Sequence, residues 1–122
     1  MTSRLIFSGV FFLFMIASGI WLSRLGRPLN AALFNVHKIA ALIFVVSAVL
    51  ILIKLFKTAD LANPMKTAAL LIGLFLLAGF VSGALLSFDK MATAITLTIH
   101  KIAPILITLC TAALLYLRST GK

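Results

Sequence analysis

The sequence predicts an all-α membrane protein, a transmembrane four-helix bundle with up-down-up-down topology made of two tandem helical-hairpin repeats. Of its 122 residues, 63% are hydrophobic and only 11% are charged, whereas charged residues make up about a quarter of a soluble globular domain. Long uncharged stretches separate the charges, and the second half of the chain repeats the first. No stretch remains for a soluble domain, so we expect residues 1–122 to form a single transmembrane domain.

Four helices are predicted near residues 5–23, 28–55, 66–88 and 90–118. A helix needs about 20 apolar residues to cross a hydrocarbon core roughly 30 Å thick, and the uncharged runs 5–23 and 67–88 have about this length. The uncharged parts of the second and fourth, 39–53 and 102–117, span only about 22–24 Å. These two helices must therefore extend back through a His-Lys pair. We expect Pro28 to open the second helix and Asp89 to cap the fourth.

The internal repeat aligns "GVFFLFMIASGIWLS" (9–23) with "GLFLLAGFVSGALLS" (73–87), and "HKIA" at 37–40 with "HKIA" at 100–103. Repeat one spans 1–57 and repeat two spans 64–122. Because the first segment has a counterpart, we expect it to remain in the mature protein and not to be a cleaved signal peptide. Two helices per repeat make this a parallel repeat. His37 and His100 are then predicted to lie at the same depth, facing each other across the bundle axis.

The net charge of +9 indicates contact with anionic lipid headgroups and not with nucleic acid, because the cations sit in loops and at helix ends. Both termini are predicted to be cytoplasmic by the positive-inside tendency, in a bacterial or archaeal cytoplasmic membrane. Apart from the intrahelical Lys38 and Lys101, the predicted cytoplasmic side carries Arg4, Lys54, Lys57, Lys66, Arg118 and Lys122, and the other side Arg24, Arg27 and Lys90. The acidic residues, Asp60 and Asp89, both fall in predicted loops, which disfavours an ion-coupled exchanger.

The two histidines are the candidate functional residues, because ionisable side chains inside a membrane are costly. Two imidazoles at matched depth favour axial coordination of one haem iron by His37 and His100. A zinc or copper site would recruit three or four ligands, and Cys110 lies ten residues beyond His100. We expect each Nδ1–H to donate to a carbonyl one turn back, at Leu33 and Thr96. The alternative is that each histidine only joins neighbouring helices.

Other residues fit a haem site and also have simpler interpretations. Gly19 and Gly83 would let a macrocycle approach the backbone, or would serve close helix packing. The cations near the histidines would bind haem propionates, or would reach lipid phosphates. These cations are Lys38, Lys101, Arg24 and Arg27.

A transmembrane four-helix bundle with two such histidines resembles the membrane b-type cytochromes, such as the haem-bearing anchor subunits of succinate dehydrogenase and formate dehydrogenase. The resemblance covers the whole chain but rests on His37 and His100 alone. It implies a non-covalent haem b and electron transfer, as an electron-transfer protein or redox subunit and not a stand-alone enzyme. Besides the bilayer, the candidate partners are a quinone, a redox partner protein or a second copy of the chain. The alternatives are a small transporter or channel, and a structural membrane anchor without haem.

Overall fold

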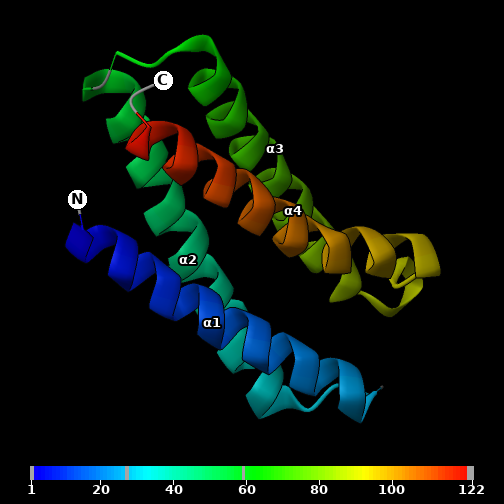
Figure 1. The fold of residues 1–122 in the computed structure, drawn as a ribbon. Helices are drawn as coiled ribbons and strands as arrows, with labels where there is room; N and C mark the ends of the chain where they lie inside the picture. The colour runs from blue at the N-terminus through cyan, green and yellow to red at the C-terminus, as the bar shows by residue number, and fades with distance from the viewer. Residues whose placement is uncertain (1, 27, 59, 121–122) are drawn as a thin grey trace. The chain divides into compact units, whose positions relative to one another are not determined.

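The computed structural model describes residues 2–26, 28–58 and 60–120, which are almost entirely helical (Figure 1). The elements are, in chain order, α1 (Thr2–Leu25), α2 (Ala31–Thr58), α3 (Asn63–Leu86), the short 3-10 helix η1 (Asp89–Met91) and α4 (Ala94–Ser119). No strand is found in the described part of the chain. The predicted all-α class and the four predicted helices are therefore confirmed.

The starts of α2 and α4 differ from the prediction. Pro28 does not open α2 but lies in the preceding loop, and the side-chain oxygen of Asn30 accepts the N–H of Leu33 at 3.0 Å. Asp89 does not cap α4 but begins η1. The cap is Thr93, whose hydroxyl oxygen accepts the N–H of Thr96 at 3.2 Å. In both places the helix begins where a short polar side chain can bind one of the N–H groups left free in the first turn.

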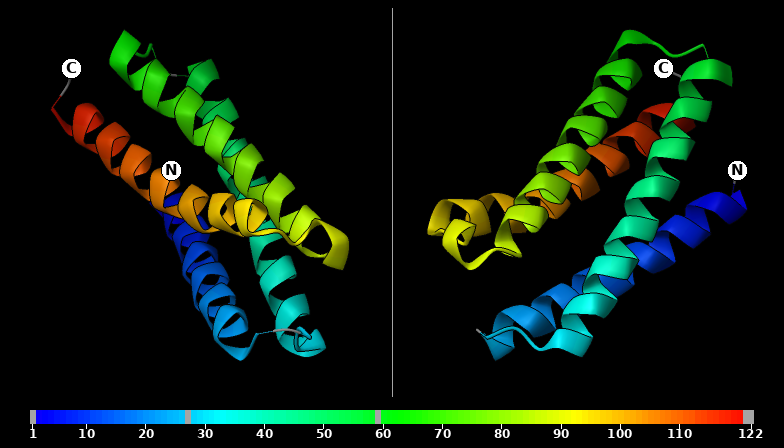
Figure 2. Two further views of the ribbon diagram at one scale, coloured as in Figure 1. Left: turned by 90° about the vertical axis from the view of Figure 1, so that its right-hand side faces the viewer. Right: turned by 180° about the vertical axis from the view of Figure 1, so that it is seen from behind.

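The structure divides into two compact units, Met1–Lys54 and Leu55–Lys122. In the first unit, α1 and α2 lie side by side and run antiparallel, as the views in Figures 1 and 2 agree. In the second unit, which includes the last turn of α2, α3 and α4 form a similar antiparallel pair connected through η1. We call α1 with α2 hairpin one, and α3 with α4 hairpin two.

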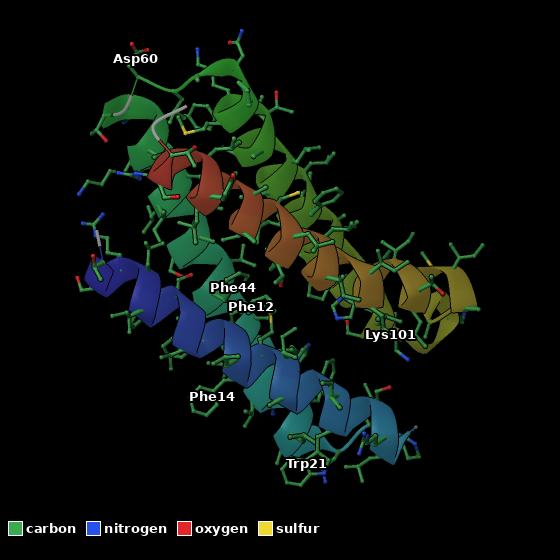
Figure 3. All side chains as sticks on the ribbon, in the orientation of Figure 1. Phe12, Phe14, Trp21, Phe44, Asp60 and Lys101 are labelled. Atoms are coloured by element: carbon green, nitrogen blue, oxygen red, sulfur yellow. The ribbon has the colours of Figure 1, made fainter. Side chains whose placement is uncertain are left out.

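All four helices are long and apolar enough to cross a membrane. Large apolar side chains cover their outer faces: on α1, Phe14 and Trp21 are 59% and 62% exposed (Figure 3). Such faces are suited to contact with lipid chains, and a helix that is apolar on all sides is typical of a membrane span. The chain is an integral membrane protein. Asp60 lies in the loop between α2 and α3, as predicted.

Each hairpin has a packed seam between its two helices. In hairpin one, the rings of Phe12 and Phe44 meet with their centroids 4.9 Å apart (Figure 3). In hairpin two, Gly79 faces Ala103 so closely that a Cβ on Gly79 would lie 3.3 Å from the Cβ of Ala103. These seams determine which side chains of α1 and α3 meet the histidines of α2 and α4.

Candidate histidine sites in the two hairpins

His37 contacts the facing helix of its own hairpin. Its Nδ1 lies 2.9 Å from the carbonyl oxygen of Met15 and 3.1 Å from the hydroxyl oxygen of Ser18, both on α1. A carbonyl oxygen only accepts hydrogen bonds. Nδ1 therefore carries the proton and donates it towards α1.

His100 has the same surroundings in hairpin two. Its Nδ1 lies 3.0 Å from the carbonyl oxygen of Gly79 and 3.2 Å from the hydroxyl oxygen of Ser82, both on α3. We expected the acceptors one turn back on the histidines' own helices, at Leu33 and Thr96. The acceptors that the structure shows lie on the facing helices, where the close approach of the two helices brings a carbonyl to the ring.

This hydrogen bond determines the tautomer of each ring. In a neutral imidazole one nitrogen is protonated and the other has a lone pair. Because Nδ1 donates to a carbonyl in both hairpins, Nε2 is the nitrogen with the lone pair. Histidines that bind metals generally have this arrangement, with the second ring N–H held by a backbone carbonyl or a carboxylate.

A buried serine completes each site. Ser18 and Ser82 are only 6% and 4% exposed. Their hydroxyls donate to carbonyls of their own helices, that of Ser18 to Phe14 at 2.7 Å and that of Ser82 to Gly79 at 3.1 Å. The serine oxygen consequently has lone pairs left for the histidine. We did not predict this role, although the aligned repeats show the same Ser-Gly pair in both halves.

Gly19 and Gly83 make room for the imidazole rings. A Cβ built on Gly19 would lie 2.9 Å from Cε1 of His37, and one on Gly83 would lie 2.9 Å from Cε1 of His100. Real Cβ atoms essentially never come so close, so only glycine leaves space for the ring in this position. By contrast, Gly9 and Gly73 have nothing within 4 Å of such a Cβ. The predicted contact of Gly19 and Gly83 with a macrocycle stays a prediction.

The two lysines next to the histidines lie outside these clusters. Both Lys38 and Lys101 are exposed, and Lys101 is labelled in Figure 3. The amino group of Lys38 lies over the ring of Phe34, 4.8 Å from its centroid. Of the other predicted cations, Arg24 is in the last turn of α1, and Arg27 lies outside the described residues. Their predicted contact with haem propionates stays a prediction.

Each hairpin therefore provides one imidazole in a defined orientation and tautomer. Among the described residues, no group of three or more His, Cys, Asp or Glu side chains lies together. No family model, curated protein or solved structure matches this chain. The chemistry of the two histidine sites is consequently the main guide to function.

Proposed function

We propose that His37 and His100 are the axial ligands of one haem b and that the chain transfers electrons in the membrane. The observation that carries this proposal is the repeated Nδ1–H···O=C bond, 2.9 Å long to Met15 and 3.0 Å long to Gly79. In each hairpin it prepares Nε2 to bind a metal. Both imidazoles therefore have the tautomer that a bis-histidine haem site requires.

The donor set fits haem better than a bare metal ion. Haem iron needs two protein ligands at most, because the macrocycle supplies the other four, and imidazole is a common axial ligand. Zinc takes four ligands in structural sites, and three protein ligands plus water in catalytic ones. Each described histidine cluster provides one imidazole, one serine and one carbonyl. Two such clusters supply two imidazoles, which is the number that a six-coordinate haem requires.

The residues of this chain would bind and orient the cofactor. His37 and His100 would fill both axial positions, which leaves no open position for O₂ or another substrate. Haem supplies a reversible one-electron couple when it is bound, so electron transfer is the expected role. Lys38 and Lys101 each follow a histidine directly and are exposed. Their long side chains would reach towards the membrane interface and neutralise propionates.

The same contacts also favour a second candidate, a structural membrane anchor. The two histidines form hydrogen bonds between the helices of their own hairpins, and such bonds can stabilise membrane helix pairs by about 0.6 kcal/mol. In this candidate the rings would only join helices, and haem would be absent. The two candidates differ in a property that is simple to measure.

The deciding experiment is spectroscopy of the full-length chain purified in detergent. We expect one haem b per chain by the pyridine haemochrome assay and a low-spin bis-histidine spectrum. His37→Ala and His100→Ala should each abolish the low-spin spectrum, because one ligand cannot fill both axial positions. Asn35→Ala is the matched control, since it removes an exposed polar side chain from the same helix as His37.

Two outcomes would overturn the proposal. If the chain neither purifies with haem nor takes it up from added hemin, the structural anchor is the better explanation. If haem is bound but either single histidine variant keeps an unchanged spectrum, the two histidines do not form the ligand pair.

A further inference from the structure

We infer that Ser18 and Ser82 are positioning residues that give the Nδ1–H of each histidine a second acceptor and lower the reduction potential of the haem. This inference rests on the proposed haem function. It concerns two serines that the ligand set does not include, and that do not need to touch the cofactor in order to act on it.

The hydroxyl protons of these serines are used within their own helices. Ser18 donates to the carbonyl of Phe14 at 2.7 Å, and Ser82 donates to the carbonyl of Gly79 at 3.1 Å. The serine oxygen then faces the ring nitrogen as an acceptor, 3.1 Å from Nδ1 of His37 and 3.2 Å from Nδ1 of His100. Each Nδ1–H thus has two acceptors, a carbonyl and a hydroxyl.

The second acceptor matters because the carbonyl is shared. In an α-helix every interior carbonyl already accepts the N–H four residues further on. The carbonyl oxygens of Met15 and Gly79 also lie 3.1 Å from the hydroxyls of Ser18 and Ser82, so each histidine shares its carbonyl with other donors. The serine oxygen adds electron density at Nδ1 in a low-dielectric setting, where hydrogen bonds are stronger than in water. With the glycine behind Cε1, it also limits rotation of the ring.

A stronger hydrogen bond from Nδ1–H makes the opposite nitrogen more basic. A more basic axial ligand stabilises ferric iron relative to ferrous iron, and so the one-electron couple moves to a lower reduction potential. The two sites have nearly the same distances. We therefore expect the two serines to contribute about equally and independently.

The test compares Ser18→Ala, Ser82→Ala and the double variant in the full-length chain. Potentiometric titration should give a more positive midpoint potential for each single variant, and a larger shift for the double variant. Titration with hemin should show a loss of haem affinity of about 10–100-fold, the usual effect of removing such a partner. Ser18→Thr keeps the hydroxyl and should restore most of both properties.

The matched control is Ser8→Ala. Ser8 is also a buried serine on α1, but it accepts a hydrogen bond from Ser47 and not from a histidine. If the role of the serines were purely structural, Ser8→Ala and Ser18→Ala would lower the stability of the protein to a similar extent and leave the midpoint potential unchanged. We expect Ser8→Ala to keep the parent potential and haem affinity.

A second measurement separates this inference from the haem proposal. In the haem-free protein, ¹⁵N NMR of labelled histidine should report Nδ1–H for both rings. Ser18→Ala and Ser82→Ala should each shift the Nδ1–H proton resonance of one ring upfield, because that proton loses one of its two acceptors. If haem binds and the serine variants keep the parent potential, the inference is overturned and the haem proposal stands. If no variant or parent binds haem, the haem proposal fails, and an unchanged Nδ1–H resonance in the serine variants then overturns the positioning role as well.

Discussion

The two hairpins share one polar site but differ in almost everything packed around it. The bonds from Nδ1 are 2.9 and 3.1 Å long in hairpin one and 3.0 and 3.2 Å long in hairpin two. The seam beside the site is aromatic in hairpin one, where Phe12 meets Phe44. At the equivalent positions hairpin two has Leu76 and Ile107, which are both buried.

The parts of the seams that lie farther from the histidines differ even in polarity. In hairpin one, the hydroxyl of Ser47 donates to Ser8 at 3.1 Å. The equivalent residues in hairpin two are Cys110 and the buried Ile72. The seams are thus filled by different side chains in the two hairpins, whereas serine, glycine and histidine recur at the imidazole site.

One difference inside the site supports the same conclusion. The carbonyl that accepts from the histidine belongs to Met15 in hairpin one and to Gly79 in hairpin two. Since the acceptor is a backbone atom, the side chain at this position is free to vary. The other residues of the site are the same in both hairpins. Serine and histidine contribute their side chains, and glycine leaves space for the ring.

The two hairpins would not be equivalent if they entered the membrane from opposite sides, and a test of this has the largest expected effect. With Cys110 replaced by serine, cysteines introduced singly at Ser3 and Ser119 should react with an impermeant maleimide from the same face, and one at Ser87 only from the opposite face. All three positions are exposed in the structure. Labelling of Ser3 and Ser119 from opposite faces would contradict the parallel repeat and the matched depth of the histidines.

Replacement of the site glycines should have the next largest effect. In Gly19→Ala or Gly83→Ala the new Cβ would lie 2.9 Å from the ring. The ring must then move and weaken its bonds, at a cost of about 1–3 kcal/mol for overpacking. Haem content per folded chain should fall in both variants, as measured by the haemochrome assay on monodisperse protein.

Gly9→Ala and Gly73→Ala are the controls for this prediction, because they lie on the same two helices with nothing within 4 Å of the new Cβ. They should keep the haem content of the parent and be slightly more stable, since alanine favours a helix over glycine by about 0.5–1 kcal/mol. If Gly19→Ala or Gly83→Ala destabilises the fold while haem per folded chain stays constant, the glycines serve helix packing alone.

The smallest expected effect concerns the polar pair that is specific to hairpin one. Ser47→Ala removes the hydrogen bond to Ser8 and should lower the free energy of unfolding by about 0.6 kcal/mol, a typical value for such bonds between membrane helices. Titration with SDS in mixed micelles measures this change. Cys110→Ser, the reciprocal change in hairpin two, should bring no comparable gain, because Ile72 offers no hydrogen-bonding group. A shifted haem spectrum in Ser47→Ala would show that this seam is coupled to the histidine site.

Hydrophobic runs, charge placement and the repeat were enough to predict the all-α class, four membrane helices, and His37 and His100 as the candidate residues. These features depend on the length and composition of single segments, which the sequence records directly. The helix starts at Asn30 and Thr93 were missed, although both have short polar side chains of the kind that caps helices. Proline and aspartate are also common near helix starts. A local sequence pattern therefore does not decide whether α2 begins at Pro28 or Asn30, or α4 at Asp89 or Thr93.

Only the tertiary structure showed which atoms accept hydrogen bonds from the histidine rings and that Gly19 and Gly83 leave space for those rings. The register and distance between α1 and α2, and between α3 and α4, determine that Nδ1 meets a carbonyl of the facing helix and that Cε1 lies against a glycine. A helix that is apolar on every side has no stripe to indicate which face meets its partner. The Ser-Gly pair at 18–19 and again at 82–83 was visible as an identity in the aligned repeats. Its function followed only when close helix packing brought it to within hydrogen-bonding distance of the histidine.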